Sequence, residues 1–403
     1  MARSSRGRPS LCFMKGVIDS PLPQVAMKKI LFPLITLVLI IAVFLIGFEM
    51  ILRQVWVPPR GLYDYSHPFI RRHIRAGVDL PYHGDAVTGF GGEFHIQGGP
   101  IGYRTDSVLS REKKPGVYRI FFLGGSTTAC TYLPQEKTFP QLIEDHLNPA
   151  GASATYECAN AGVDGCAARD SLAQLIYNVS WAQPDCVIVM QGVNDFALGL
   201  TPDYEEDASD RRTARSKAKS SYEEFEGDPH PYIYQFYKHL TRKHSKRFTL
   251  AHIHDEREKL AHLERKEIFE FPNIVSFEKY MKMIAGVAKS LGLRLIFVTQ
   301  CSLYAEVLPP EIEERLGIPF PEEDQLNPSN ASMKRGMDAY NNAIRQISTE
   351  MGVELIDLET QVPKTLDFLY DHVHFTVEGN RKVAEVISEY LKNHPASADP
   401  EVN

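Results

Sequence analysis

The sequence lacks the short motifs of several common protein classes. Its six cysteines form no C-x-x-C pair or other metal-type spacing. It has no G-x-x-x-x-G-K-[ST] phosphate loop, and no G-x-G-x-x-G motif opens a helix, which argues against a nucleotide-binding domain. Basic residues are not in excess, because 44 Lys and Arg stand against 51 Asp and Glu. A general nucleic-acid binder would normally be basic, so we expect no nucleic-acid partner.

One long segment lacks charge altogether. Residues 30–48, ILFPLITLVLIIAVFLIGF, are long enough at about 1.5 Å per residue to cross the core of a lipid bilayer. A cleaved signal peptide, the alternative, would have a shorter apolar core and a small-residue cleavage site, whereas this run ends in EMILRQVW. The sequence therefore predicts an uncleaved transmembrane anchor over residues 28–53.

Positive charges lie mainly before this segment. Only two basic residues follow it closely, whereas six precede it: Arg3, Arg6, Arg8, Lys15, Lys28 and Lys29. The positive-inside rule then predicts a single-pass protein with a cytoplasmic N-terminus and everything after Val55 in the periplasm or outside the cell. Met27 is also a plausible start, so residues 1–27 are either a cytoplasmic tail or an extension ahead of the true start.

The remainder of the chain alternates between strand-like and helix-like segments. Residues 54–117 are rich in Pro, Gly, Tyr and His, and predict a stalk or wrapping segment. A domain over 118–395 follows, because strands alternating with helices predict a parallel sheet covered on both faces. Five strands are predicted in it, at 118–123, 154–159, 186–191, 293–299 and 353–358. Helices are predicted between or after them, at 139–147, 169–182, 276–292, 333–352 and 377–393.

Residues 202–275 interrupt this alternation and predict an insertion, which is either a lid or a passive surface excursion. His252, His254 and Asp255 lie there in a charged amphipathic run, which does not favour a metal site. Five cysteines follow the anchor, an odd number, so at least one is free or pairs between chains; a disulfide between Cys130 and Cys166 is one option.

Glycine and short polar residues follow each of the first three predicted strands. These loops are Gly124-Gly125-Ser126, NAGVDG at 160–165 and GVND at 192–195. Because the carboxyl ends of parallel strands lie at one edge of a sheet, we expect the loops to form one pocket. Ser126 is interpreted as a nucleophile at a helix N-terminus, and the alternative is a simple helix cap.

An acid and a base are available near the C-terminus, in DHVHFTVEGN at 371–380. Asp371 and His374 are three residues apart, so their side chains can touch, and the carboxylate would then orient the imidazole that deprotonates Ser126. The expected oxyanion donors are the N–H groups of Ser126 and Gly162 and the side-chain amide of Asn194. We expect His372 to line the entrance and Asp195 to be a structural cap.

Together these motifs resemble the four blocks of the SGNH (GDSL-type) hydrolase family, in order over residues 118–392. The resemblance implies that Ser126 is the nucleophile, Gly162 and Asn194 belong to the oxyanion hole, and Asp371 and His374 are the acid and base. It also implies a three-layer α/β/α fold with a five-stranded parallel sheet, and esterase or lipase-like activity without metal or cofactor. GYRTDS at 102–107 is similar to exported bacterial members with an N-terminal anchor. Many members have Asp before the nucleophile, so Gly125 leaves open how the first loop is held.

The sequence thus predicts a membrane-anchored serine ester hydrolase that acts through an acyl-enzyme on O-acetyl carbohydrate or short-chain lipid esters. An O-acyltransferase that modifies polysaccharide is the alternative, because the same acyl-enzyme serves both reactions. Aromatic residues of 230–240, if they cover the pocket and exclude water, would favour transfer. A non-catalytic carbohydrate-binding protein on the same fold is a third hypothesis, which the intact Ser126, Asp371 and His374 disfavour.

Overall fold

A computed structural model describes residues 24–56, 61–105, 109–150, 155–200, 231–241, 246–247, 263–271, 273–317 and 327–395. Cys12, His252, His254 and Asp255, together with most of the predicted insertion, lie outside these residues. The chain divides into two units. One contains helices α1 and α7, and the other contains the remaining elements described below.

Five parallel strands form the central sheet of the second unit, in the order β10-β9-β7-β5-β6. All five strands predicted from the sequence are confirmed to within two residues. They were recognisable as short apolar runs because a strand covered on both faces buries every side chain, as the central strand β7 does. Their bounds are β5 (Val117–Gly124), β6 (Thr155–Asn160), β7 (Cys186–Met190), β9 (Arg294–Val298) and β10 (Glu354–Ile356).

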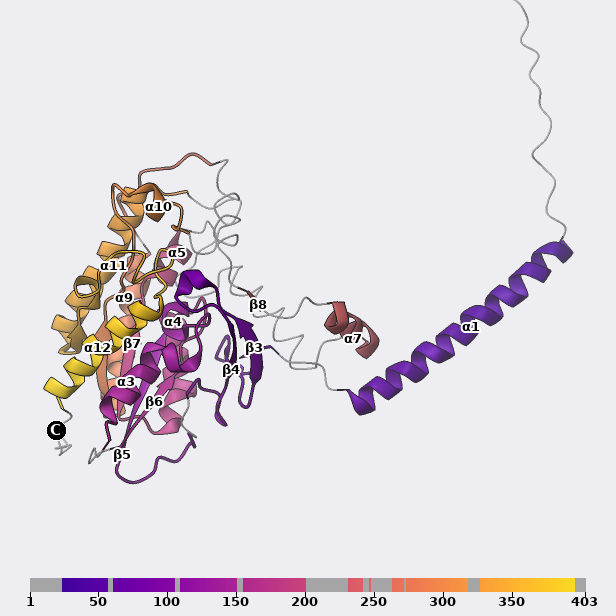
Figure 1. The fold of residues 1–403 in the computed structure, drawn as a ribbon, viewed down its shortest axis with the longest axis horizontal. Helices are drawn as coiled ribbons and strands as arrows, with labels where there is room; N and C mark the ends of the chain where they lie inside the picture. Colours follow the sequence, from indigo (N-terminus) through magenta and orange to yellow (C-terminus); the bar gives the residue numbers. More distant parts are fainter. Residues whose placement is uncertain are drawn as a thin grey trace, which may run out of the picture. The chain divides into compact units, whose positions relative to one another are not determined.

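Helices cover both faces of this sheet, so the predicted three-layer α/β/α fold is confirmed (Figure 1). Helices α3 (Phe139–Leu147) and α12 (Val377–Asn393) pack against each other. A second group, α4 (Ala168–Tyr177), α9 (Ile274–Ser290) and α11 (Asn330–Met351), forms the other layer. Along the chain, shorter helices occur between these strands and longer helices: α2 (Ser126–Ala129), α5 (Val193–Gly199), α10 (Pro310–Glu313), η2 (Gln135–Lys137), η3 (Val179–Ala182) and η4 (Leu358–Thr360).

The side chains of β5 show how the layers meet. Phe122 points to the α3 side, where its ring centroid lies 5.6 Å from that of Phe139. Its neighbour Phe121 points to the opposite face, as successive strand residues do, and its ring lies 4.8 Å from that of Tyr103. All four rings are almost fully buried. The core therefore lies on both sides of the strand that leads directly to Ser126.

The segment that precedes β5 forms two small sheets. Strands β1 (Tyr63–Asp64) and β2 (His73–Ile74) pair in one. Strands β3 (Asp79–His83) and β4 (Glu93–Gln97) form an antiparallel hairpin around η1 (Ala86–Thr88), and β8 (Lys246–Arg247) pairs with β3. Leu62, Ile74 and Ile96 form an apolar cluster with Val163 and Cys166, which lie in the loop after β6. This segment therefore packs against one of the loops expected to form the pocket.

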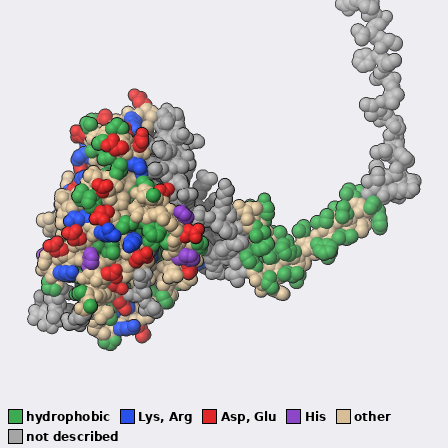
Figure 2. All heavy atoms as spheres, viewed as in Figure 1, with side chains coloured by type: hydrophobic (Ala, Val, Ile, Leu, Met, Phe, Trp, Pro, Cys, Tyr) green, Lys and Arg blue, Asp and Glu red, His purple; other side chains and the backbone are tan. Residues whose placement is uncertain are grey.

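The other unit is built on one long apolar helix, α1 (Gln24–Val55). Its residues Leu31–Val55 are long and apolar enough to cross a membrane, and none of the apolar window is buried. Hydrophobic side chains cover the visible face of α1, in contrast to the mixed charges of the sheet-containing unit (Figure 2). Helix α7 (Tyr232–Thr241) comes from the predicted insertion and contacts α1.

The five cysteines of the described chain are all buried and unbonded. The disulfide considered between Cys130 and Cys166 is therefore not formed. Burial raises the pKa of the Cys130 thiol to about 12 and that of Cys166 to about 11. These thiols are accordingly protonated and unreactive near neutral pH.

Candidate active site

Ser126, His374 and Asp371 form one hydrogen-bonded chain. Ser126 is the first residue of α2, directly after β5 and the two glycines. Its Oγ lies 2.7 Å from Nε2 of His374, and Nδ1 of the same imidazole lies 2.7 Å from Oδ2 of Asp371. The fold thus brings together the three residues singled out in the sequence. Such a chain can move the Ser126 proton to His374 as the hydroxyl oxygen attacks a carbonyl carbon.

The local turn holds Asp371 ionised. Its Oδ1 accepts hydrogen bonds from the backbone N–H groups of Val373 and His374, at 2.9 Å and 2.8 Å. Burial alone would raise the pKa of Asp371, but the imidazoles of His374 and His372 and these hydrogen bonds lower it to about 2. Because an ionised carboxylate only accepts hydrogen bonds, Nδ1 of His374 carries the proton and Nε2 is the lone-pair site that faces Ser126.

Asn194 lies beside the nucleophile turn, at the start of α5. Its side chain is 5% exposed, and Nδ2 donates to the Cys166 carbonyl at 2.8 Å. A Cβ placed on Gly125 would lie only 2.2 Å from the same nitrogen. Since the amide carries two protons, one remains for a group bound next to Ser126.

Gly162 lacks the free N–H that its predicted oxyanion role requires. Its amide donates to Oδ1 of Asn160 at 2.9 Å, because the Asn160 side chain folds back over its own turn. A Cβ at Gly162 would also lie 2.5 Å from the backbone nitrogen of Ala129. Gly162 is therefore a close-packing glycine beneath α2, and the prediction for this residue needs correction.

The second glycine of the same loop, Gly165, has the properties that Gly162 lacks. It occupies a turn closed by the hydrogen bond from Cys166 N–H to Val163 O at 3.1 Å, with φ of +66°. No acceptor for its N–H occurs among the described residues. Its carbonyl is held by Nη2 of Arg71 at 2.7 Å. The only sequence signal for Gly165 was its place in NAGVDG. In the structure it directly precedes Cys166, whose carbonyl accepts a hydrogen bond from Asn194.

Gln300 connects two of the site loops. It follows β9 and is 3% exposed. Its Nε2 donates to Oγ1 of Thr127, and its Oε1 accepts from the N–H of Val193, both at 2.9 Å. The backbone of Gln300 is in turn held by two hydrogen bonds with the Asn341 side chain. The sequence reasoning missed this residue, because nothing local distinguishes it from other polar residues at a strand end.

Two further residues bind the backbone carbonyls of the turn that carries Ser126. Asn160 Nδ2 donates to the Thr128 carbonyl at 2.8 Å, and Arg104 Nη1 donates to the carbonyls of Ala129 and Cys130, both at 2.8 Å. The hydrogen bonds from Asn160, Arg104 and Gln300 thus hold the nucleophile turn in place, although Gly125 stands where many family members have Asp.

Asp195, expected to be a structural cap, is confirmed as one. Its carboxylate accepts the N–H of Ala168, the first residue of α4, at 3.0 Å and 3.1 Å. Burial raises the pKa of Asp195 to about 7. The carboxyl group therefore stabilises the start of α4, which follows the 160–165 loop, and no hydrogen bond described in the structure joins it to the triad.

His372 is buried beside the triad, at 6% exposure, where an entrance position was expected. Its Nδ1 accepts the N–H of Gly317 at 3.3 Å, and its ring centroid lies 5.7 Å from that of Tyr304 and 6.0 Å from that of His374. Burial lowers the pKa of His372 to about 4, so the ring is neutral near pH 7.

Aromatic side chains pack beside the His374 imidazole. The Tyr370 ring stacks on the imidazole at 5.6 Å, with 11° between the planes. Val87 and Tyr132 pack against Tyr370. Since Val87 belongs to the β3–β4 hairpin, the segment before the main sheet contributes to the surroundings of the catalytic base.

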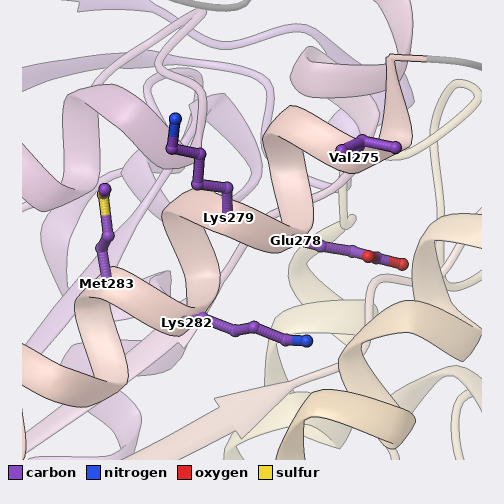
Figure 3. A pocket seen from close by; sticks show the side chains of 5 residues that line it. All are labelled: Val275, Glu278, Lys279, Lys282 and Met283. Carbon is purple, nitrogen blue, oxygen red and sulfur yellow. The ribbon is translucent and has the colours of Figure 1, made fainter.

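A hollow of about 440 Å³ lies elsewhere, along α9 (Figure 3). All the side chains that line it come from that one helix, and Lys282 pairs with Glu350 at 2.8 Å. The described residues that line it include no serine, cysteine or histidine. We therefore regard the Ser126 site as the candidate active site.

Comparisons with solved structures gave matches at low sequence identity. They include an acetylxylan esterase from Geobacillus stearothermophilus (15% identity, TM-score 0.38, covering 71% of this chain and 97% of that one). Others are a lipase/acylhydrolase from Enterococcus faecalis (15%, 0.39, 70% and 100%) and a further acetyl xylan esterase (17%, 0.37, 68% and 99%). The comparison with curated proteins gave no match.

A family model gave the most informative match. The model of the GDSL-like Lipase/Acylhydrolase family covers residues 122–382, well over half of the 403 residues. The matched region begins within β5 and ends within α12, and so includes Ser126, Asn194, Asp371 and His374. The chain therefore belongs to the GDSL-like lipase/acylhydrolase family, the SGNH-type ester hydrolases.

Proposed function

We propose that this esterase is a membrane-anchored serine hydrolase that works through an acyl-enzyme. The observation that carries the proposal is the hydrogen-bonded chain from Asp371 through His374 to Ser126. His374 Nε2 accepts the hydroxyl proton as Ser126 Oγ bonds to the ester carbonyl carbon. The tetrahedral intermediate then expels the alcohol, which takes the proton from His374. Water, deprotonated by the same imidazole, releases the acid and restores Ser126.

The oxyanion of that intermediate would be held by three donors. These are the backbone N–H groups of Ser126 and Gly165 and Nδ2 of Asn194. Gly165 replaces Gly162 in this set, because the Gly162 N–H already donates to Asn160. Donors in a site that excludes water stabilise the developing charge strongly, and the loss of one typically lowers the rate about 10²–10³-fold.

The substrate that we propose is a small O-acyl ester, either an O-acetyl group on a carbohydrate or a short-chain lipid ester. The half-buried ring of Tyr132, which packs against Tyr370 beside the base, supports this choice, because an aromatic ring suits the apolar face of a sugar or a short acyl chain. We also propose that α1 anchors the protein, with the N-terminus in the cytoplasm and the catalytic unit outside. The exposed apolar surface of α1 supports the anchor, and the basic residues that precede it support this orientation.

The test uses the full-length chain in detergent or membranes, with p-nitrophenyl acetate, butyrate and octanoate as substrates. Hydrolysis should disappear in Ser126→Ala and persist in Ser290→Ala, which removes an exposed hydroxyl at the end of α9. A fluorophosphonate should label the wild type once, at Ser126. A Ser126→Ala protein that keeps the wild-type rate would contradict the proposal. Product formed only when a sugar acceptor is added would identify a transferase.

A further inference from the structure

Helix α7 is attached to the last turns of α1 by aromatic side chains. The Phe236 ring lies 6.3 Å from that of Phe48 and 5.1 Å from that of Trp56, and Tyr232 lies 6.2 Å from Trp56. All three pairs meet edge to face. Leu52 is 4% exposed, whereas most of α1 is open. The two helices lie side by side in the same unit (Figure 1).

Hydrogen bonds to the Glu49 side chain of α1 hold the start of α7 in place. The Glu49 carboxylate accepts the N–H groups of Tyr232 and Ile233, both at 3.0 Å, and also accepts Nε of Arg53 at 2.8 Å. The Arg53 guanidinium lies 4.9 Å from the Tyr232 ring centroid. A carboxylate at the end of an apolar helix is costly without partners. The first amides of α7 provide such partners, which explains the position of Glu49.

Beside its contact with α1, helix α7 exposes several large apolar and aromatic side chains. Tyr237 is 61% exposed and Leu240 is 65% exposed, and Tyr234 is 39% exposed. These residues are spaced three apart and therefore form one stripe along the helix. Lys238 Nζ lies 4.7 Å over the Tyr234 ring. The helix thus combines an open apolar stripe, tyrosine hydroxyls and a positive charge.

We propose that α7 lies in the interfacial layer of the membrane that α1 crosses, with Tyr237 and Leu240 in contact with lipid. The inference rests on the proposed membrane anchoring. Phe48 and Trp56 join the exposed apolar surface of α1 to α7 through their contacts with Phe236. Trp and Tyr prefer the depth of the lipid head groups, and amphipathic helices that carry Lys lie at that depth. Helix α7 is thereby held at the membrane surface.

The test places an NBD fluorophore at single cysteines in the full-length chain, in vesicles of phosphatidylcholine and phosphatidylglycerol. Cys12→Ser removes the cysteine outside the described residues, and the remaining five are buried and should not label. Tyr237→Cys and Leu240→Cys report on α7, Leu39→Cys reports on α1, and Val307→Cys, at 89% exposure, is the aqueous control. Bromine on lipid acyl chains quenches buried labels, and iodide quenches exposed ones.

We expect the two α7 labels to emit at shorter wavelength than Val307→Cys, and to be quenched by lipid bromines and protected from iodide. If they behave like Val307→Cys while the Leu39→Cys label is quenched by lipid, the interfacial position of α7 is wrong and the anchor stands. If the Leu39→Cys label is also unquenched, both the anchor and the interfacial helix are wrong.

Discussion

A methyl group added at Gly125 should disable the oxyanion site with little effect on the fold. The backbone at Gly125 is extended, with φ of −84° and ψ of −153°, and its negative φ lies outside the left-handed region that favours glycine. The new Cβ would lie 2.2 Å from Nδ2 of Asn194, far inside van der Waals contact, and 3.1 Å from the Cys166 carbonyl oxygen. Asn194 must therefore move by about 1 Å or more to reach ordinary carbon–nitrogen contact. It would lose both its hydrogen bond to Cys166 and its place beside Ser126.

The expected magnitude follows from the loss of one oxyanion donor. We expect kcat of Gly125→Ala to fall about 10²–10³-fold. The free energy of unfolding should fall by only about 1 kcal/mol, the typical net value of one hydrogen bond. The assay is kcat and KM on p-nitrophenyl butyrate together with urea unfolding. Gly286→Ala is the matched control, because a Cβ there meets no atom within 4 Å and alanine favours a helix interior.

A double-mutant cycle tests the mechanism itself. If Gly125→Ala acts by displacing the amide, it should add little to the defect of Asn194→Ala, since the group that it displaces is already absent. Additive losses in the double variant, or a wild-type kcat in Gly125→Ala, would refute the reasoning.

Three further predictions concern the surroundings of the triad. Gln300→Leu removes the hydrogen bonds to Thr127 and Val193, so kcat should fall at least about tenfold with KM little changed, and Gln300→Glu, which keeps the acceptor for Val193, should recover part of it. His372 has its pKa lowered from 6.5 to about 4, so the unfolded chain binds its proton first and this residue destabilises the fold as pH falls from 6.5 to 4. His372→Asn should therefore gain stability relative to wild type over that range, by up to about 3 kcal/mol in urea unfolding at each pH. Asp195, whose pKa of about 7 acts in the opposite direction, is common to both proteins and cancels in the difference. Iodoacetamide at pH 8 should leave the five buried thiols of the native protein unmodified and modify them after unfolding, as measured by mass spectrometry.

Much of the fold could be predicted because its signals are local. Each central strand is a short apolar run, and helices α3 and α12 were predicted with the bounds that the structure has. The contact between Asp371 and His374 was also local, since three residues separate them and one turn brings them together. Ser126 was recognisable by its place after β5 and the two glycines.

The oxyanion loop shows where local signals end. NAGVDG offers two glycines, and the sequence contains nothing that separates their roles. Gly162 is excluded because Asn160 accepts its N–H, and Gly165 is favoured because its turn leaves the N–H without a described acceptor. Both facts depend on side-chain and turn conformations, which the order of residues alone does not reveal.

The amino-acid sequence by itself determined the parallel α/β domain, the family and the three residues of the triad, because apolar periodicity and short motifs act over a few residues. Only the tertiary structure decided which loop amide is free, that Gln300 joins Thr127 to Val193 across 173 and 107 residues of chain, and that α7 packs on α1. Such contacts arise between segments distant in sequence, where packing and hydrogen bonding select one partner among many of equal local character.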